Sequence, residues 1–194
     1  RGEWDGLISI DTAKAAVAEA ALSGGADLVN DVTGLRGDHR MIEVCRESGA
    51  GVIVMHMQGE PRTMQAAPHY EDVVTEVRAF FENRWKVLTG AGIEAECLSF
   101  DPGIGFGKTL EHNLALLAHL DRLVVHERPL VVGLSRKSFI GKVLGDNAPE
   151  LREWPTIALT AAMRGKGAMI HRVHAVRENR EALRMMEAVL KGDG

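Results

Sequence analysis

The stretch LSFDPGIGFGKTLEHN, residues 98–113, indicates the fold more directly than any other part of the chain. An apolar segment leads through a glycine-rich turn into a segment with helical spacing, which is the strand–turn–helix order of an α/β protein. The turn does not match a phosphate loop, because Pro102 stands where the first glycine of G-x-x-x-x-G-K-[ST] belongs. Its three alternate glycines read GxGxG, so the dinucleotide fingerprint GxGxxG is also absent. We therefore expect the turn after Asp101 to serve another kind of ligand.

The same unit recurs along the whole chain. Short apolar runs that predict strands occupy residues 7–11, 27–31, 51–57, 98–103, 129–135 and 169–174. Segments that predict helices occupy residues 13–25, 39–51, 70–92, 112–123, 156–167 and 177–190. This alternation predicts a parallel sheet, and the nearly continuous apolar character of the runs predicts strands covered on both faces. Six units favour an incomplete (β/α)8-type barrel, with an open doubly wound sheet as the alternative.

The composition predicts one globular domain over residues 1–194, because 45% of the residues are hydrophobic. A net charge of -4 argues against a nucleic-acid-binding protein. Cys45 and Cys97 are widely spaced and form no CxxC pair, which indicates small apolar side chains in a reducing cytoplasm. The sequence contains no run of eighteen apolar residues that would predict a membrane span, and RGEWDG at its start is not a signal-peptide pattern.

Polar side chains stand at the carboxyl end of every predicted strand. They are Asp11, Asn30, His56 with Met57, Asp101, the segment 135–138, and Arg172 with His174. Ligands of parallel α/β folds bind at this end of the strands. An open sheet uses mainly the residues at one switch point, so convergence from all six strands favours the barrel.

The chemistry of these side chains differs between the early and the late strands. Asp11, Asn30 and Asp101 offer carboxylate and amide groups that suit the hydrogen-bonding edge of a nitrogen heterocycle. The segments 135–138 and 172–174 bring lysine, arginine and histidine, which suit a phosphate or pyrophosphate. The pocket is therefore predicted to bind a ligand with a ring at one end and an anion at the other.

Five segments also carry a resemblance to a known family. They are VNDVTG (29–34), VMHMQGEPRTMQ (54–65), FDPGIGFGK (100–108), GLSRKSFIG (133–141) and RVHAV (172–176). In this order they resemble the dihydropteroate synthase family, and the second and third are highly specific when found together. The resemblance implies a (β/α)8 barrel of folate biosynthesis that joins a dihydropterin-methyl pyrophosphate to para-aminobenzoate and releases pyrophosphate, with Mg2+. It also implies a cytoplasmic homodimer and a sulfonamide target.

The resemblance implies a role for individual positions. Substrate-binding roles fall on Asp11, Asn30, Met57, Asp101, Phe106, Gly133, Lys137, Ser138, Arg172 and His174. The first two and Asp101 match pterin-binding residues, and Met57 matches a residue under the pterin ring. Phe106 and Ser138 match residues of the aminobenzoate site. The expected catalytic residues are Lys137 between the two substrates and the pyrophosphate-binding pair Arg172 and His174, and no metal ligand is expected.

The sequence departs from the family pattern in two places. Ala175 stands where the family usually has Asp, which removes a carboxylate that could orient His174. The family's first two βα units, which carry an Asn of the Mg2+ and pyrophosphate site, have no counterpart here, and the missing initial Met favours a fragment over a degenerate relative. We therefore expect an open barrel with an exposed apolar edge, and pterin binding without measurable turnover by this chain alone.

Simpler interpretations exist for several of these residues. Asp11 could cap a helix, Asn30 with Asp31 could form a turn, and His56 could be a core histidine. The side chains of Lys108 and Arg136 could be solvated.

The resemblance also implies a role for the glycine-rich turn. DPGIGFGK (101–108) resembles a loop for pterin and aminobenzoate, whose glycines would let the backbone pass close to a flat ring and whose Asp101 would bind the amino edge of that ring.

Two other functions remain as alternatives. A pterin-dependent methyltransferase also places strand-end Asp and Asn on a pterin ring, but it would have no place for an aminobenzoate site in residues 135–138. A non-catalytic pterin-binding relative is the other alternative. Binding of methyltetrahydrofolate compared with aminobenzoate separates the first, and binding without turnover indicates the second.

Overall fold

The computed structural model describes residues 2, 4–59, 63–145 and 148–192. Its sheet consists of β1 (Ser9–Asp11), β2 (Leu28–Asp31), β3 (Gly51–Met55), β4 (Leu98–Asp101), β5 (Leu130–Val132) and β6 (Ala168–His171). All five neighbouring pairs are parallel, and the strand order β1-β2-β3-β4-β5-β6 follows the chain. A doubly wound sheet reverses its strand order at a switch point, so this order confirms the incomplete barrel and excludes the alternative.

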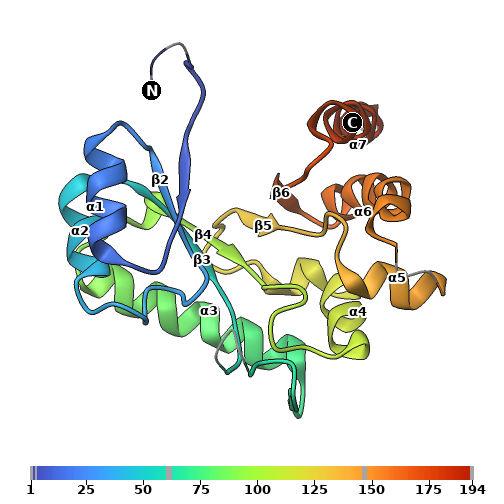
Figure 1. Cartoon of the computed structure of the whole chain (residues 1–194), viewed down its shortest axis with the longest axis horizontal. Helices are drawn as coiled ribbons and strands as arrows, with labels where there is room; N and C mark the ends of the chain where they lie inside the picture. Colours follow the sequence, from blue (N-terminus) through green and yellow to red (C-terminus); the bar gives the residue numbers. More distant parts are fainter. Residues whose placement is uncertain (1, 3, 60–62, 146–147, 193–194) are drawn as a thin grey trace.

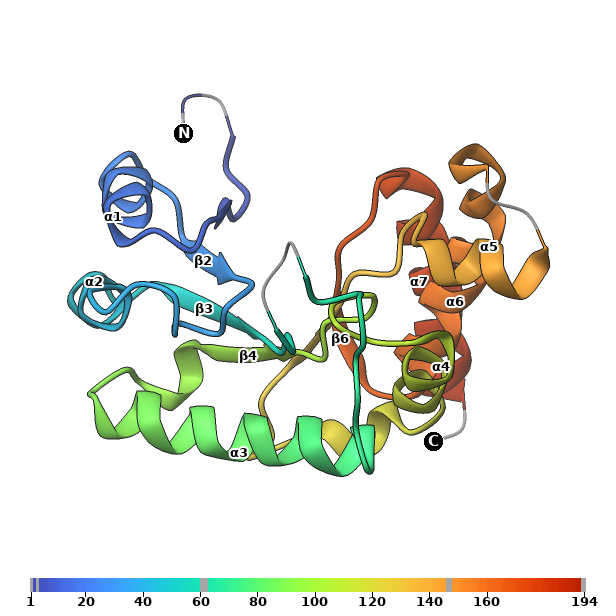
Figure 2. The same ribbon diagram turned by 60° about the horizontal axis from the view of Figure 1, so that its bottom comes forward.

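Helices follow the strands along the chain and cover the outer face of the curled sheet (Figures 1 and 2). They are α1 (Ala15–Ser23), α2 (Met41–Ser48), α3 (Val73–Gly90), α4 (Leu110–Ala118), α5 (Ser138–Leu144), α6 (Glu153–Gly165) and α7 (Val176–Gly192). Three short 3-10 turns lie at η1 (Ala95–Cys97), η2 (Leu120–Leu123) and η3 (Pro149–Arg152). Of these helices, α5 was not predicted, because seven residues with a glycine in the middle give too little periodicity to read.

Local sequence explains where the longest helix begins and which face it buries. The Asp72 carboxylate accepts hydrogen bonds from the backbone N–H groups of Val74 and Thr75 at 3.0 and 3.1 Å, which makes it the N-cap of α3. From there Val77, Phe81 and other apolar side chains at helical spacing turn inward. The predicted apolar face of residues 70–92 is therefore confirmed.

The core lies between the sheet and these helices. Phe81 of α3 and Phe100 of β4 are fully buried, and their ring centroids are 4.9 Å apart. Every residue of β4 is buried, as expected of a strand covered on both faces. The edge strand β6 instead leaves Met169 and Ile170 exposed, which confirms the expected apolar edge. In the described ranges, no helix is long and apolar enough to cross a membrane.

The carboxyl ends of the first and last strands meet across the curled sheet. The Arg172 guanidinium, just after β6, forms an ion pair at 3.0 Å with the Asp11 carboxylate at the end of β1. These residues are 161 positions apart in the chain. The curvature therefore brings the polar ends of all six strands around one region.

Candidate active site

A cavity of about 300 Å³ opens at the carboxyl end of the sheet. Its lining consists of Ser9, Asp11, Asn30, Ile53, Asp101, Val131, Ile170, His171 and Arg172. The three residues predicted to bind a ring, Asp11, Asn30 and Asp101, thus share one cavity. Sequence reasoning missed Ser9, Val131 and Ile170, although each precedes a strand-end residue by two positions and so shares its face of the strand.

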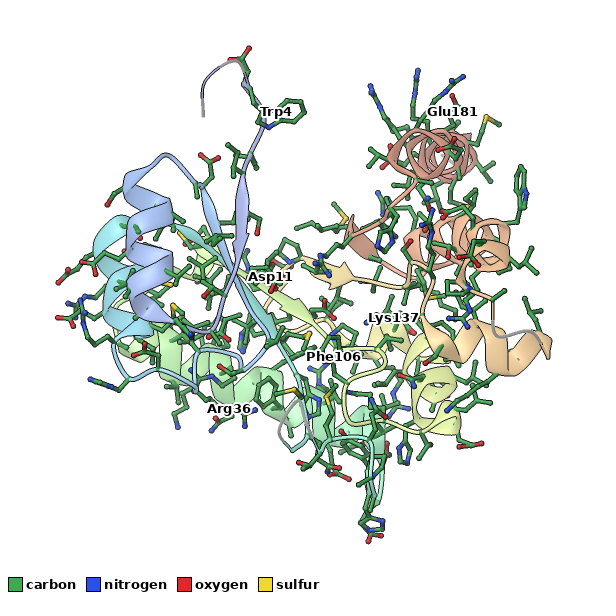
Figure 3. All side chains as sticks on the ribbon, in the orientation of Figure 1. Trp4, Asp11, Arg36, Phe106, Lys137 and Glu181 are labelled. Atoms are coloured by element: carbon green, nitrogen blue, oxygen red, sulfur yellow. The ribbon has the colours of Figure 1, made fainter. Side chains whose placement is uncertain are left out.

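A second cavity of about 180 Å³ adjoins the first. It is lined by Gly133, Ser135, Lys137, Arg172, Val173 and His174, which include all three predicted catalytic residues. Arg172 lines both cavities and joins them. Asp11, Lys137 and Phe106 lie near the middle of the molecule in Figure 3, whereas Trp4, Arg36 and Glu181 lie farther out.

Asp11, Asn30 and Arg172 form a hydrogen-bonded group at the mouth of the first cavity. The Asn30 amide donates to the same Asp11 oxygen that binds Arg172, at 3.3 Å. Among the described residues, the buried side-chain oxygen of Asn30 has no hydrogen-bond partner. A buried acceptor without a partner is rare and suits an N–H group of a ligand. Arg172 is 71% exposed, so its ion pair with Asp11 contributes little stability and a ligand could displace it.

Asp101 is buried at the floor of the first cavity. One of its carboxylate oxygens accepts a hydrogen bond of 2.7 Å from the backbone N–H of Gly103. Burial raises the pKa of the Asp101 carboxyl, while the Lys137 ammonium and the Gly103 N–H lower it. The charges of Lys108 and Arg172 also lower the pKa of this carboxyl.

Lys137 lines the second cavity and contacts the glycine-rich turn. Its ammonium lies 4.6 Å from the centroid of the Phe106 ring and donates to the Ile104 carbonyl. Burial, and to a lesser degree Arg172, lower the pKa of Lys137 to about 8, although the Asp101 carboxylate acts to raise it. The charge of this residue is therefore sensitive to pH just above neutrality.

Three predicted residues lie outside both linings. Met57 is buried at the exit of β3, and the exposed Ser138 begins α5. Phe106 also lines neither cavity, but it contacts Lys137 through its ring. The structure thus gathers the ring-binding and anion-binding candidates more tightly than the candidates for an aminobenzoate site.

Ser135 holds His174 in place. Its hydroxyl oxygen lies 2.7 Å from the imidazole Nδ1 and accepts the backbone N–H of His174 at 3.3 Å. The family pattern predicts a carboxylate at position 175 that would orient His174, but this chain has Ala175 there. The structure supplies an orienting hydroxyl from the neighbouring strand instead, which a search confined to adjacent residues could not find.

Residues 1–174 match the protein family described as pterin binding enzyme. The chain belongs to this family. Among curated relatives, the dihydropteroate synthase of Escherichia coli strain K12 is 45% identical over 184 residues, which cover 94% of this chain and 64% of the relative. That of Neisseria meningitidis serogroup C is 39% identical over 188 residues, covering 96% of this chain and 66% of the relative. The chain thus spans about two thirds of the length of these relatives.

Solved structures of dihydropteroate synthases have the same fold. The Yersinia pestis enzyme in a sulfonamide drug complex matches with a TM-score of 0.94 at 40% identity, covering 98% of this chain and 69% of that one. The Thermus thermophilus enzyme in complex with 6HMPPP matches with a TM-score of 0.89 at 46% identity, covering 95% and 72%. These matches confirm the barrel fold and the family resemblance seen in the sequence.

In this pterin-binding family member, two of the three glycines of the turn approach protein backbone. Gly103 and Gly107 have φ values of 63° and 61°, which favour glycine. A Cβ atom at Gly103 would collide with the carbonyl oxygen of His56, and one at Gly107 with that of Gln58. The expectation that the glycines accommodate a flat ligand was therefore wrong for these two positions. They let the turn pack against the exit of β3.

Lys108 is the second correction. Its side chain is 3% exposed, not solvated, and its ammonium donates to protein acceptors. The prediction failed because the acceptors come partly from residue 56, which is distant in sequence. The expectation for Arg136 was right, since its side chain is 43% exposed and pairs with Glu153 at 2.7 Å.

Of the simpler interpretations, the one for Asp11 is wrong, and those for Asp31 and His56 are right. Asp11 does not cap a helix; the N–H of Ala15 in α1 instead donates to the Asp38 carboxylate at 2.9 Å. The buried Asp31 carboxylate accepts from the N–H groups of Thr33 and Leu35, so the turn interpretation is right for Asp31. Asn30, beside it, belongs to the cavity. The interpretation of His56 as a core histidine is confirmed, since it is 8% exposed.

The charges around the second cavity, where an anion is expected, do not fit a protein-bound magnesium ion. Mg2+ prefers oxygen ligands and usually takes one or two carboxylates from the protein. In the part of the chain that the structure describes, no group of three or more His, Cys, Asp or Glu residues could hold a metal ion. The second cavity is lined by the cationic side chains of Lys137 and Arg172, which suit an anion.

Proposed function

We propose that this chain acts in dihydropteroate synthesis, joining a dihydropterin-methyl pyrophosphate to para-aminobenzoate with release of pyrophosphate. One observation carries the proposal: a cavity with carboxylate and amide groups adjoins a cavity with lysine, arginine and histidine, and Arg172 lines both. A substrate with a heterocycle at one end and a pyrophosphate at the other would match this division of charge. The Thermus thermophilus relative has been solved in complex with 6HMPPP and with 4-aminobenzoate.

Asp101 and Asn30 would hold the ring. Asp101 has one carboxylate oxygen bound to Gly103, which leaves the other for a ligand N–H. Asn30 contributes the buried oxygen without a partner among the described residues. Both acceptors line the first cavity, and they suit N–H donors on the edges of an aminopyrimidine ring.

Arg172, His174 and Lys137 would stabilise the leaving pyrophosphate. Arg172 would exchange its exposed ion pair with Asp11 for the phosphate oxygens, a geometry that guanidinium groups favour. Ser135 would keep the His174 imidazole directed at the same cavity. Negative charge grows on the leaving oxygen as its bond to carbon breaks, so preorganised positive charge at this point lowers the barrier.

The rest of the reaction requires that a weak nucleophile, the aminobenzoate nitrogen, be held in position. The aminobenzoate nitrogen forms a bond to the methylene carbon as the carbon–oxygen bond to pyrophosphate breaks, and the nitrogen then loses a proton. Lys137, with Phe106, Gly133 and Ser138 nearby, would hold the second substrate beside the first. Orienting two reactants in this way supplies much of the rate enhancement without a covalent intermediate.

Three further properties belong to the same proposal. Mg2+ would be required by the pyrophosphate, although the described residues provide no site for it. Cys45 and Cys97 are both free thiols, which supports work in a reducing cytoplasm.

A homodimer would cover the apolar groove of about 270 Å³ between α4, α5 and α6, where Val143 and Leu144 are exposed. Sedimentation of the chain and of Val143→Glu tests the dimer, which the substitution should dissociate.

Binding and turnover test the proposed function separately. Calorimetry should show binding of the dihydropterin pyrophosphate and of 7,8-dihydropteroate, with methyltetrahydrofolate at least tenfold weaker, about 1.4 kcal/mol. Release of pyrophosphate is then measured with aminobenzoate and Mg2+, for the chain alone and for the chain joined to the first two βα units of the Escherichia coli relative. Preference for methyltetrahydrofolate would indicate the methyltransferase instead. Pterin binding without turnover in both forms would indicate a non-catalytic relative.

A further inference from the structure

Lys108 is a buried lysine whose side-chain nitrogen has three acceptors within the protein, and burial lowers its pKa to about 7 although the Asp101 carboxylate raises it. Its ammonium nitrogen lies 3.0 Å from Nδ1 of His56, 3.1 Å from the Gly103 carbonyl and 3.0 Å from the Phe106 carbonyl. Lys108 is 3% exposed, and it lines neither of the two cavities. No role in binding or catalysis has been assigned above to this residue.

His56 accepts the hydrogen bond from Lys108 as a neutral imidazole. Burial lowers the pKa of His56 to about 3, and the neighbouring Lys108 charge lowers it as well. The ring is therefore uncharged at neutral pH, with its proton on Nε2 and a lone pair on Nδ1 directed at the ammonium. The exit of β3 thus provides a fixed anchor for the end of the turn.

The turn that Lys108 holds also presents the contact surface for Lys137. The Ile104 carbonyl accepts a hydrogen bond from the Lys137 ammonium, which also lies over the Phe106 ring. Gly103 and Phe106, which bracket this surface, are the two residues whose carbonyls Lys108 binds. The position of Lys137 against the turn therefore depends on Lys108 through the backbone.

We propose that Lys108 is a positioning residue that shapes the subsite for the aromatic amine, by fixing the backbone that carries Phe106 and receives Lys137. The inference rests on the proposed function, because the subsite is that of the second substrate. Binding of the first substrate's ring should depend much less on Lys108. Asp101 belongs to β4, and its own hydrogen bond comes from the Gly103 N–H and not from Lys108.

A second tether acts on the same turn through a neutral group. The Tyr70 hydroxyl, just before α3, donates to the Gly107 carbonyl at 2.9 Å. Tyr70 is buried, and its ring lies 6.0 Å from the Lys108 ammonium. Removal of this hydroxyl leaves the ring and the charge in place, so it loosens the turn with little change in packing.

The experiment compares two ligands that share the ring and differ in the aminobenzoate half. Calorimetry with 7,8-dihydropteroate and with 6-hydroxymethylpterin gives the two dissociation constants for each protein. For Lys108→Met we expect the dissociation constant to rise about tenfold or more for dihydropteroate, because two hydrogen bonds to the turn and the one that anchors it to His56 are lost. For the pterin we expect a rise of less than about threefold. Lys142→Met, the same substitution at an exposed site on α5, should change neither.

Tyr70→Phe keeps the test decisive even where Lys108→Met does not fold. It removes one hydrogen bond, and we expect dihydropteroate affinity to fall about threefold with pterin affinity unchanged. Equal losses for both ligands, or no loss for dihydropteroate in the folded variants, would overturn the positioning role. A parent chain that binds neither ligand would instead refute the proposed function itself.

Discussion

Asp101→Asn should abolish most of the affinity for a pterin ring while leaving the fold intact. The Asp101 carboxylate binds the Gly103 N–H at 2.7 Å through one oxygen, and an asparagine oxygen can replace that bond. The asparagine NH2 would then occupy the place of the second oxygen and face the N–H donors of the ring. Losing a charge-assisted hydrogen bond and leaving a donor unpaired costs about 2–4 kcal/mol, or roughly 30- to 1000-fold in affinity.

The same substitution should act on Lys137 through the electric field. The Asp101 carboxylate raises the pKa of Lys137, against the effect of burial that lowers it to about 8. Without the carboxylate this pKa falls below about 8, so a larger fraction of the lysine is uncharged at pH 7.5. A ligand that carries pyrophosphate should therefore lose more affinity in the variant at pH 8 than at pH 6.5.

Calorimetry at these two pH values, with 6-hydroxymethylpterin and with its pyrophosphate, measures both effects. Asp121→Asn is the matched control, because Asp121 is exposed on η2 and lines neither cavity. Circular dichroism checks that each variant is folded. Pterin affinity within threefold of the parent would show that Asp101 is structural, and the assignment of the first cavity would be wrong.

Further predictions concern the second cavity. Arg172→Ala and His174→Ala should each weaken pyrophosphate binding about tenfold or more and change the affinity for bare pterin less; equal losses in calorimetry would contradict the division into two cavities. Ser135→Ala should weaken pyrophosphate about three- to tenfold, since the imidazole loses its 2.7 Å partner, and pterin alone should bind as before. Affinity for the pyrophosphate ligand should fall as the pH rises through about 8, where Lys137 loses its proton. In Lys137→Met, this affinity should stay constant between pH 7 and 9.

The fold could be predicted because its signals are local. Apolar runs alternate with helical periods, and each helix carries its own start or stop, such as Asp72 before α3 and Gly49 after α2. Such features depend on residues within a few positions of each other. The parallel sheet in chain order follows from them. The seven-residue helix α5 was missed because it is shorter than two full periods of the pattern.

The candidate site was predictable only as far as the strand ends. Asp11, Asn30, Asp101 and Arg172 stand where parallel strands deliver ligand-binding groups, and they share one cavity. The contact between Asp11 and Arg172 and the support of His174 by Ser135 join strands that are distant in sequence. Pairings of this kind depend on how far the sheet curls, which no local pattern contains.

The glycine-rich turn shows why a sequence close to a phosphate loop need not bind phosphate. A phosphate loop presents unpaired backbone N–H groups and a lysine to the anion. Here the N–H of Gly103 donates to Asp101, and that of Gly105 donates to the Asn113 side chain at 2.7 Å. All three protons of Lys108 have protein acceptors. The donors that would bind phosphate therefore stabilise the turn itself, and positive charge for an anion comes from Arg172 and its neighbours on the later strands.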